Sequence, residues 1–219
     1  MSDKITVYGR ATSSNVQAVM WGAAELNLSV ERLDYGHKFG GTDTPEFRRM
    51  NPFGRVPVLK DGDEPAIFES CAILRYLAAK YGDGGPFWPA DAADRAQVDK
   101  WAEWGKLNLA LSFTVPIFWS VVRTSAADRD TVALEHAIDH FNNQISYLDA
   151  QLEGREFVAG DTLTLADIVI GHVLYRYFTI AIERRDWPNL AAYYKRLCRR
   201  DAYKSHVMIS YEDLRVPGA

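Results

Sequence analysis

Hydroxyl and amide side chains gather in the segment that joins the first apolar run to the first helical pattern. The run Thr12-Ser13-Ser14-Asn15 follows shortly after Tyr8, where the apolar run ends. The start of a helix presents unpaired backbone N–H groups and a partial positive charge, so a bound anion is stabilised there. A hydroxyl in this turn has the chemistry to hold a thiolate. Taken alone, a serine here is also typical of a simple helix N-cap.

A second stretch suited to ligand binding is Arg55-Val56-Pro57, which opens a predicted strand. Proline lacks the N–H that a sheet ladder needs, so it belongs at the first residues of a strand or at an edge. A cis bond between Val56 and Pro57 would turn the N–H and C=O of Val56 outward, free to pair with an extended, peptide-like ligand. Without further context, a trans bond is the commoner form.

A third stretch is Glu69-Ser70, at the change from strand to helix. The Ser70 hydroxyl and the N–H groups of the helix start donate to a carboxylate, while the Glu69 carboxylate accepts from an ammonium. These are the contacts that recognition of an α-amino acid end requires. On local grounds, Ser70 acting as an N-cap is the competing interpretation.

The elements that position these stretches change in character near residue 82. The first part alternates strand patterns with helical patterns, in a β-α-β and then a β-β-α order. The β-α-β start implies a parallel strand pair with a right-handed crossover. The expected strands are residues 5–8, 30–33, 56–59 and 66–68, and the expected helices are residues 15–26, 45–49 and 70–80.

Glycine and proline are dense in residues 81–89, and we place the linker at 83–89, between domains at 1–82 and 90–219. The second domain shows only helical periodicity and is predicted to be an all-helical bundle. Thr164 and Asp167 form a capping box, worth about 1 kcal/mol, at the start of one of its helices. The expected helices are residues 91–110, 116–123, 129–152, 165–182 and 188–199.

Composition excludes several classes of protein. The chain has 219 residues and a formal charge of −4, and it lacks the basic stripe that nucleic-acid binders carry. Two cysteines and no apolar leader favour the reducing cytoplasm. The most apolar stretch, 168–182, is interrupted by His172 and Arg176 and is too short to cross a membrane. His136 and His140 have zinc-ligand spacing without a third ligand, so no metal site is predicted.

Taken together and in this order, these stretches resemble the soluble glutathione transferase family, most closely its serine-type bacterial and phi- or theta-like branches. The resemblance implies a thioredoxin-like α/β domain with a mixed four-stranded sheet, followed by the all-α domain. It also implies glutathione as cosubstrate, no covalently bound cofactor, and a homodimer. It extends over essentially the whole chain and is carried by residues 8–15, 51–57, 69–73, 164–167 and 188–190.

The resemblance assigns the contact with the glutathione sulfur to the hydroxyl of Ser13. Asn15 matches a sulfur-contacting asparagine of some bacterial members and would share or take the role. Tyr8 stands where tyrosine-type members keep their catalytic hydroxyl, and Ser14 is the remaining competitor. Cys71 lies outside the first turn, where cysteine-type members keep theirs, which disfavours disulfide chemistry.

The other glutathione contacts are also implied by the resemblance. Val56, before a cis Pro57, matches the residue whose backbone pairs with the cysteinyl unit. Glu69 and Ser70 match the pair that holds the γ-glutamyl end. Arg55 is a candidate for contact with the glycyl carboxylate.

Two residues before the hairpin have further implied roles. Lys38 is a second candidate for the glycyl carboxylate, in a loop that aligns less well. Phe53 occupies the place of an aromatic that plugs into the partner subunit, or else anchors the loop on its own domain.

A small hydrophobic electrophile is expected in the cleft between the domains. Its candidate contacts, each of which core packing explains equally well, are Phe113, Pro116, Trp119 and Arg123.

The predicted function is therefore transfer of the glutathione thiolate to a small hydrophobic electrophile. A non-catalytic binding module, like those of some translation and stress proteins that resemble the family, is the alternative from another class. A third possibility keeps glutathione but performs peroxide reduction, isomerisation or dehalogenation.

Overall fold

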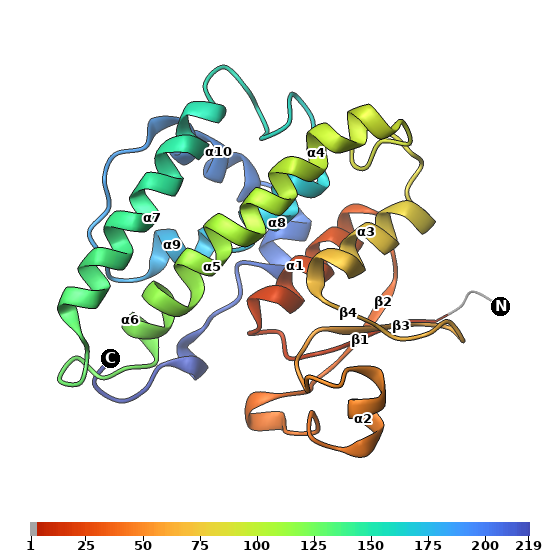
Figure 1. Cartoon of the computed structure of the whole chain (residues 1–219), viewed down its shortest axis with the longest axis horizontal. Helices are drawn as coiled ribbons and strands as arrows, with labels where there is room; N and C mark the ends of the chain where they lie inside the picture. Colours follow the sequence, from red (N-terminus) through yellow and green to blue (C-terminus); the bar gives the residue numbers. More distant parts are fainter. Residues whose placement is uncertain (1–3) are drawn as a thin grey trace.

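The computed structural model describes residues 4–219, and its N-terminal part is built on a mixed four-stranded sheet (Figure 1). The strand order is β2-β1-β3-β4. β1 is parallel to β2, with Val7 opposite Arg32, and antiparallel to β3, with Val7 opposite Leu59. The predicted strand arrangement is thus confirmed. The strands are β1 at Ile5–Tyr8, β2 at Val30–Leu33, β3 at Val58–Asp61 and β4 at Ile67–Phe68.

Helices lie on both sides of this sheet (Figure 1). Helices α1, Ser14–Glu25, and α3, Ser70–Tyr81, pack together on the side that faces the helical domain. The 3-10 turn His37–Phe39 and helix α2, Pro45–Met50, lie on the other side. Phe47 of α2 is buried and stacks on Tyr35, with ring centroids 5.5 Å apart. This contact anchors the segment that holds the 3-10 turn and α2, residues 37–50, to the rest of the domain.

A single helix runs from residue 92 to residue 122 and forms one wall of the molecule (Figure 1). We predicted two helices here, with a break before Pro116, and that prediction is wrong. Pro116 lies in a π-helical segment, whose wider turn accommodates a ring that would clash with the preceding turn of a regular helix. The successive parts are α4 at Ala92–Trp104, a π segment at Gly105–Ala110, α5 at Leu111–Phe113, a second π segment at Thr114–Trp119 and α6 at Ser120–Val122.

This long helix is, within the described part of the chain, the one helix with the length and apolar composition of a membrane span. About half of its most apolar stretch, 44%, is buried inside the protein. The core helix of a soluble protein has the same properties. The apolar side chains that remain exposed on it recur every four residues, at Leu107, Leu111, Val115 and Trp119.

The remaining helices complete the C-terminal domain. The predicted helix 165–182 is in fact two helices, the second of which ends at Thr179. The break between them lies at His172, whose ring Nδ1 is 2.7 Å from the Val169 carbonyl oxygen. A continuing helix would need that oxygen for the N–H of Val173. The sequence patterns did not predict α11 or the last 3-10 turn. The helices are α7 at Thr131–Gln151, α8 at Leu165–Gly171, α9 at Leu174–Thr179, α10 at Pro188–Leu197, α11 at Asp201–His206 and the turn Glu212–Leu214.

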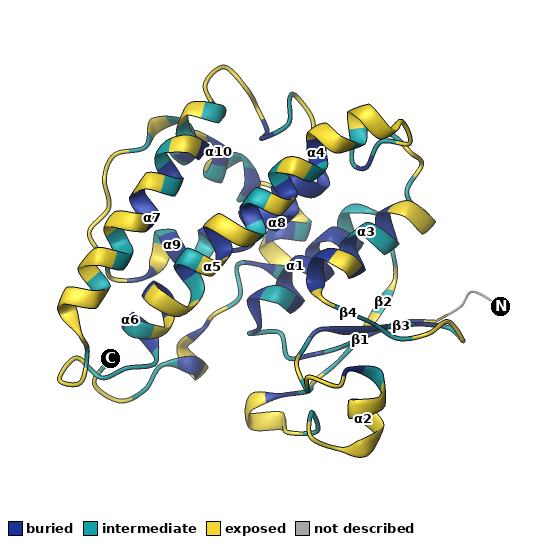
Figure 2. Cartoon of the chain, viewed as in Figure 1, coloured by how far each residue is buried: buried dark blue, intermediate teal, exposed yellow. Residues whose placement is uncertain are grey.

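Helix α8 is the centre of the core, and all of its residues are buried (Figure 2). Glycines allow its close packing, since a Cβ on Gly105 would stand 2.5 Å from Ile170 and one on Gly171 would stand 2.8 Å from Trp21. The predicted capping box at its start is confirmed: Thr164 N donates to Asp167 Oδ2 at 2.8 Å.

The Asp167 carboxylate does more than cap α8. Its Oδ1 also accepts from Val158 N at 3.0 Å and from the Tyr193 hydroxyl at 2.9 Å. Burial raises the pKa of Asp167, and these donors act in the opposite direction. One carboxylate therefore joins the loop before α8, the helix itself and α10.

Candidate active site

A cavity of about 570 Å³ opens between the two domains, within the size range usual for ligand pockets. Its N-terminal wall is formed by residues 12–15, 36–37 and 54–56. Its other wall is one face of the long helix, together with Arg176 from α9. The turn after β1 thus meets the segment before β3 and the long helix in one place.

Ser13 is the N-cap residue of α1 and lines this cavity. Its backbone oxygen accepts from Gln17 N at 2.9 Å, as expected of a helix start. Its side chain, however, makes no capping hydrogen bond. The hydroxyl is therefore free of the role that the capping interpretation assigned to it, and it stands beside the N–H groups of the first turn. Ser14 and Asn15 line the cavity as well, whereas Tyr8 is not among its lining residues.

Asn15 is held by two residues from other helices. Its Oδ1 accepts from Lys106 Nζ at 2.9 Å and from Ser70 Oγ at 3.4 Å, and Lys106 Nζ lies 3.3 Å from Ser70 Oγ. Since the amide oxygen is occupied, the Nδ2 donor is the group that Asn15 has left for a ligand. These hydrogen bonds connect the first turns of α1 and α3 to the middle of the long helix.

Glu69 and Ser70 lie outside the cavity lining, and the Ser70 hydroxyl is hydrogen-bonded to two lining residues, Asn15 and Lys106. Ser70 is the first residue of α3 rather than its N-cap, and Glu69 takes the N-cap position. Capping by the Ser70 hydroxyl, the competing interpretation of this stretch, is therefore not observed. Glu69 has φ 69°, an unusual conformation for a non-glycine residue and one that is found preferentially at functional sites.

The segment before β3 presents backbone groups to the cavity. The Val56–Pro57 bond is cis, Val56 lines the cavity, and the β3 ladder begins only at Val58. Within residues 4–219, the N–H and C=O of Val56 take part in no backbone hydrogen bond. The buried Asn51 fixes this segment by donating from Nδ2 to the Arg55 carbonyl oxygen at 2.8 Å. The Arg55 side chain is exposed and lines the cavity.

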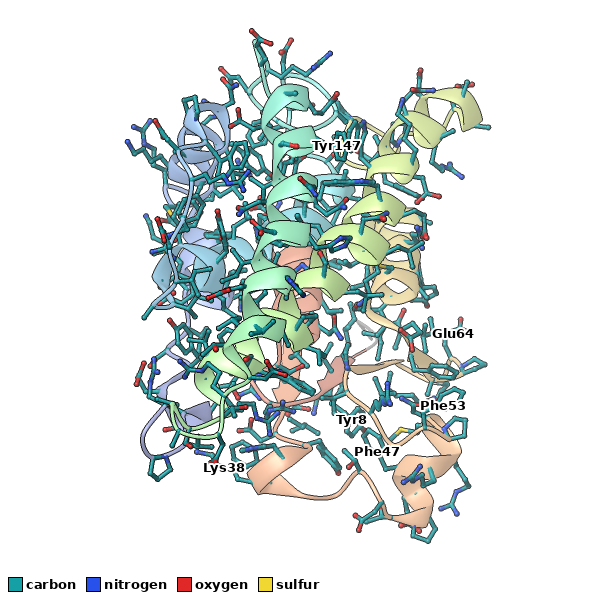
Figure 3. All side chains as sticks on the ribbon, turned by 60° about the vertical axis from the view of Figure 1, so that its left-hand side comes forward. Tyr8, Lys38, Phe47, Phe53, Glu64 and Tyr147 are labelled. Carbon is teal, nitrogen blue, oxygen red and sulfur yellow. The ribbon has the colours of Figure 1, made fainter. Side chains whose placement is uncertain are left out.

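Lys38 is outside the cavity lining. Its Nζ lies 2.6 Å from Asp213 Oδ2. Figure 3 shows Lys38 on the side of the 3-10 turn that faces the C-terminal segment. The neighbouring His37 lines the cavity in its place. Burial lowers the pKa of His37, and the positive charges of Arg10, Arg123 and Lys38 lower it further.

The predicted second-substrate residues divide into two groups. Trp119 and Arg123 line the cavity, with the Arg123 guanidinium 4.9 Å from the centre of the Trp119 ring. Phe113 is instead fully buried in the core, where its ring packs 5.2 Å from that of Phe141. Pro116 is exposed and lies outside the cavity lining. Trp119 and Arg123 are four residues apart and therefore share one face of the helix. Phe113 and Pro116 lie on other faces, so the four residues cannot all face one pocket.

Sequence reasoning missed Arg10, Lys106 and Arg176, which all line the cavity. Arg176 is only 4% exposed, and its Nη2 donates to the Thr12 carbonyl oxygen at 2.8 Å. Burial lowers the pKa of Arg176 to about 10, and the charge of Arg10 contributes in the same direction. The feature that could have found it is an arginine interrupting an otherwise apolar helix pattern.

Comparison with known proteins identifies this architecture. The family model "Glutathione S-transferase, N-terminal domain" matches residues 3–79, and "Glutathione S-transferase, C-terminal domain" matches residues 109–201. The chain belongs to the glutathione S-transferase family. The predicted family, the thioredoxin-like domain followed by an all-α domain, and the assignment as a transferase enzyme are confirmed.

Individual glutathione S-transferases match over nearly their whole length. Glutathione S-transferase GstB of Escherichia coli (strain K12) is 35% identical over 206 residues, which cover 94% of this chain and 98% of the relative. The crystal structure of the theta class glutathione S-transferase from the citrus canker pathogen Xanthomonas axonopodis pv. citri, with glutathione bound, has 38% identity and a TM-score of 0.89. That match covers 95% of this chain and 99% of the other. Elongation factor 1-gamma of Prunus avium is 31% identical over 91% of this chain, but over 47% of its own length.

Proposed function

We propose that this glutathione S-transferase conjugates glutathione to small electrophiles and that the Ser13 hydroxyl stabilises the thiolate. The observation that carries the proposal is the position of this hydroxyl. It stands at the start of α1, lines the cavity and makes no capping hydrogen bond. A charged sulfur beside it would receive a hydrogen bond together with the favourable field of the helix N-terminus.

The energy required for this stabilisation is modest. An unperturbed thiol has a pKa near 8.5, and lowering it by two units takes about 2.7 kcal/mol. A hydrogen bond to a charged group contributes roughly 1.5–3 kcal/mol, and a helix N-terminus adds about 0.3–1 kcal/mol. These two contributions therefore suffice. The thiolate sulfur then attacks the electrophilic carbon, and holding both reactants in one cavity supplies the proximity effect.

Two groups of residues are assigned to the ends of glutathione. We assign the γ-glutamyl end to Glu69 and to the group of Asn15, Ser70 and Lys106, which together offer an acceptor and several donors. The free backbone groups of Val56 are suited to pair with the cysteinyl unit.

The glycyl carboxylate is assigned to Arg55 and His37. Both line the cavity at its N-terminal wall, next to Val56. Lys38 is left out of this assignment because its ammonium is paired with Asp213. Contact between Lys38 and the ligand would require that ion pair to open.

We also propose a cytoplasmic homodimer. Phe53 is 64% exposed at the edge of the N-terminal domain and packs edge-on against Phe68, with ring centroids 5.8 Å apart (Figure 3). An exposed aromatic on a fixed base is suited to enter a partner subunit. A glutathione-dependent enzyme is suited to the cytosol, where the tripeptide maintains the redox poise.

A non-catalytic binding module is the alternative from another class of function. The grouping of Ser13, Asn15 and Val56 at one cavity, with Ser70 hydrogen-bonded to Asn15, favours a ligand-binding enzyme over a pure interaction module. Peroxide reduction, isomerisation and dehalogenation would use the same thiolate and are separated from conjugation only by substrate.

The test compares the purified Ser13→Ala and Ser14→Ala variants with the wild type, using glutathione and a chromogenic aryl halide. Loss of a hydrogen bond to a charged sulfur predicts that Ser13→Ala lowers kcat by about 10- to 100-fold. Calorimetric affinity for glutathione is expected to stay within about threefold, since both ends of the tripeptide remain bound. Unchanged turnover in Ser13→Ala, or a larger loss in Ser14→Ala, would assign the role to another residue.

A further inference from the structure

The cavity is strongly cationic in a protein whose formal charge is −4. No Asp or Glu is among its lining residues. Its basic lining residues, besides His37, are Arg10, Arg55, Lys106, Arg123 and Arg176. No carboxylate lines the cavity to neutralise these basic side chains, so the excess positive charge belongs to the cavity itself.

Glutathione, bound as proposed, accounts for only part of this charge. Its two carboxylates are served by Lys106 at one end and by Arg55 with His37 at the other. Arg10, Arg123 and Arg176 remain unassigned. None of these three forms an ion pair with any residue in 4–219.

Arg176 is the most deeply placed of the three. Its guanidinium lies 4.5 Å from the centre of the Phe118 ring, and one of its nitrogens donates to Thr12 O, next to Ser13 in the chain. Its buried Nε has no hydrogen-bond partner in the described structure, and the same is true of Arg10 Nε. Unpartnered donors of a buried charged group are costly unless a ligand satisfies them.

The three guanidinium groups are near enough to affect one another. The charge of Arg10 lowers the pKa of Arg176, after burial, and the charge of Arg123 lowers the pKa of Arg10, again after burial. Like charges held together in a cavity repel one another. A bound anion would relieve this repulsion.

Apolar surface adjoins the arginines. Arg123 stacks on Trp119, and Leu111 and Val115 continue the same face of the long helix along the cavity. A ligand that filled this side would therefore have an apolar or aromatic body next to a negatively charged group. Arginine is suited to a carboxylate, because its planar fork donates two parallel hydrogen bonds.

We propose that Arg10, Arg123 and Arg176 form a carboxylate site for the second substrate, so that the preferred electrophile is an apolar carboxylic acid. This inference rests on the proposed function. A suitable probe is 4-(bromomethyl)benzoate. The thiolate sulfur attacks the benzylic carbon, the C–S bond forms as the C–Br bond breaks, bromide leaves with the bonding electron pair, and the carboxylate is unchanged.

The first experiment compares 4-(bromomethyl)benzoate with its neutral analogue 4-(bromomethyl)benzamide, after subtraction of the uncatalysed rates. We expect kcat/KM for the benzoate to be at least about tenfold higher, as one charge-assisted hydrogen bond provides. Arg123→Gln and Arg10→Gln are expected to reduce that ratio about tenfold, mainly through KM of the electrophile. Both arginines are partly exposed, so these variants avoid the folding risk of replacing Arg176.

A matched control removes one positive charge elsewhere. Arg185 is exposed and pairs with Asp139, and Arg185→Gln should leave the benzoate-to-benzamide ratio unchanged. KM for glutathione should change less than about twofold in the Arg123 variant. Equal use of both electrophiles by the wild type, or an equal loss of both in Arg123→Gln, would overturn the proposal.

A binding experiment separates failure of this inference from failure of the proposed function. Calorimetry would measure 4-methylbenzoate and 4-methylbenzamide, which cannot react, with and without saturating S-methylglutathione. Tighter binding of the benzoate that is lost in Arg123→Gln supports the anion site even if neither electrophile is conjugated. Equal binding, or none of the benzoate, contradicts it even if conjugation is observed.

Discussion

Lys106 Nζ lies 2.9 Å from Asn15 Oδ1, across the boundary between the two domains. The ammonium comes from a π-helical segment in the middle of the long helix, and Asn15 is in the first turn of α1. Through this contact the helical domain sets the orientation of a side chain in the part of the cavity that is proposed to bind glutathione. The amide nitrogen of Asn15 is then the donor available to a ligand.

Replacing Lys106 by methionine should weaken glutathione binding about tenfold, because the variant loses one charge-assisted contact and releases Asn15. The measurement is calorimetric titration with glutathione. Lys100→Met is the matched control, since Lys100 is exposed on the same helix and outside the cavity lining. Equal affinity in both variants would mean that Lys106 has only a structural role.

Asp167→Ala should lower the free energy of unfolding by about 3–5 kcal/mol, well beyond the effect of a lost helix cap. The substitution leaves the N–H groups of Val158 and Thr164 and the hydroxyl of Tyr193 without their acceptor in the core, at a cost of roughly 1–3 kcal/mol for each buried group. Urea unfolding measures the difference. Asp161→Ala, at an exposed position, should stay within about 0.5 kcal/mol of the wild type. A loss of only about 1 kcal/mol in Asp167→Ala would reduce its role to capping.

Burial of His172 makes the protein sensitive to acid. Burial, with the nearby charges of Lys106 and Arg176, lowers the pKa of His172 to about 3 in the folded state. Below pH 6.5 the unfolded chain therefore binds a proton that the folded chain does not, and stability falls as the pH falls. Between pH 6.5 and 4.5 this group alone should remove about 2–3 kcal/mol from the free energy of unfolding.

The His172→Asn variant isolates that contribution. Its amide nitrogen can replace the donor to the Val169 oxygen but does not titrate. Chemical unfolding of both proteins across this pH range should give a flatter dependence for the variant. Parallel curves would show that acid sensitivity arises from other groups.

Phe53→Ser should shift the protein toward monomer, because it removes the exposed ring proposed to enter the partner. Sedimentation velocity over a range of protein concentrations would follow the shift. Tyr147, on the outer face of α7, is 63% exposed against 64% for Phe53, so Tyr147→Ser controls for the loss of an exposed aromatic (Figure 3). The same dissociation in both variants, or in neither, would contradict the proposed contact.

Local chemistry singled out several of the N-terminal segments that line the cavity. A serine before a helix, a proline at a strand start and a glutamate–serine pair each have a positional meaning within a few residues. The order of these features placed Ser13 and Val56 in the segments that the structure brings to one cavity.

The helical half was less predictable, because which face of a long helix meets a cavity depends on packing between domains. Phe113 and Trp119 look alike in sequence, yet one is in the core and the other lines the cavity. The two π segments change which side chains face the cavity further along the helix, and no local sequence pattern predicted them. Arg176 donates to the carbonyl oxygen of Thr12, which is 164 positions away in the chain, and only the tertiary fold brings the two residues together.

The most direct test of the account is the pKa of the glutathione thiol when it is bound to the protein. Ultraviolet difference absorbance of the thiolate, followed against pH with saturating glutathione, measures it for the wild type and for Ser13→Ala. We predict a midpoint about two units below the ordinary value near 8.5 for the wild type and a midpoint of about 8 in the variant, where the helix N-terminus still contributes. An unshifted midpoint in the wild type, or the same lowered midpoint in both proteins, would contradict the role of Ser13.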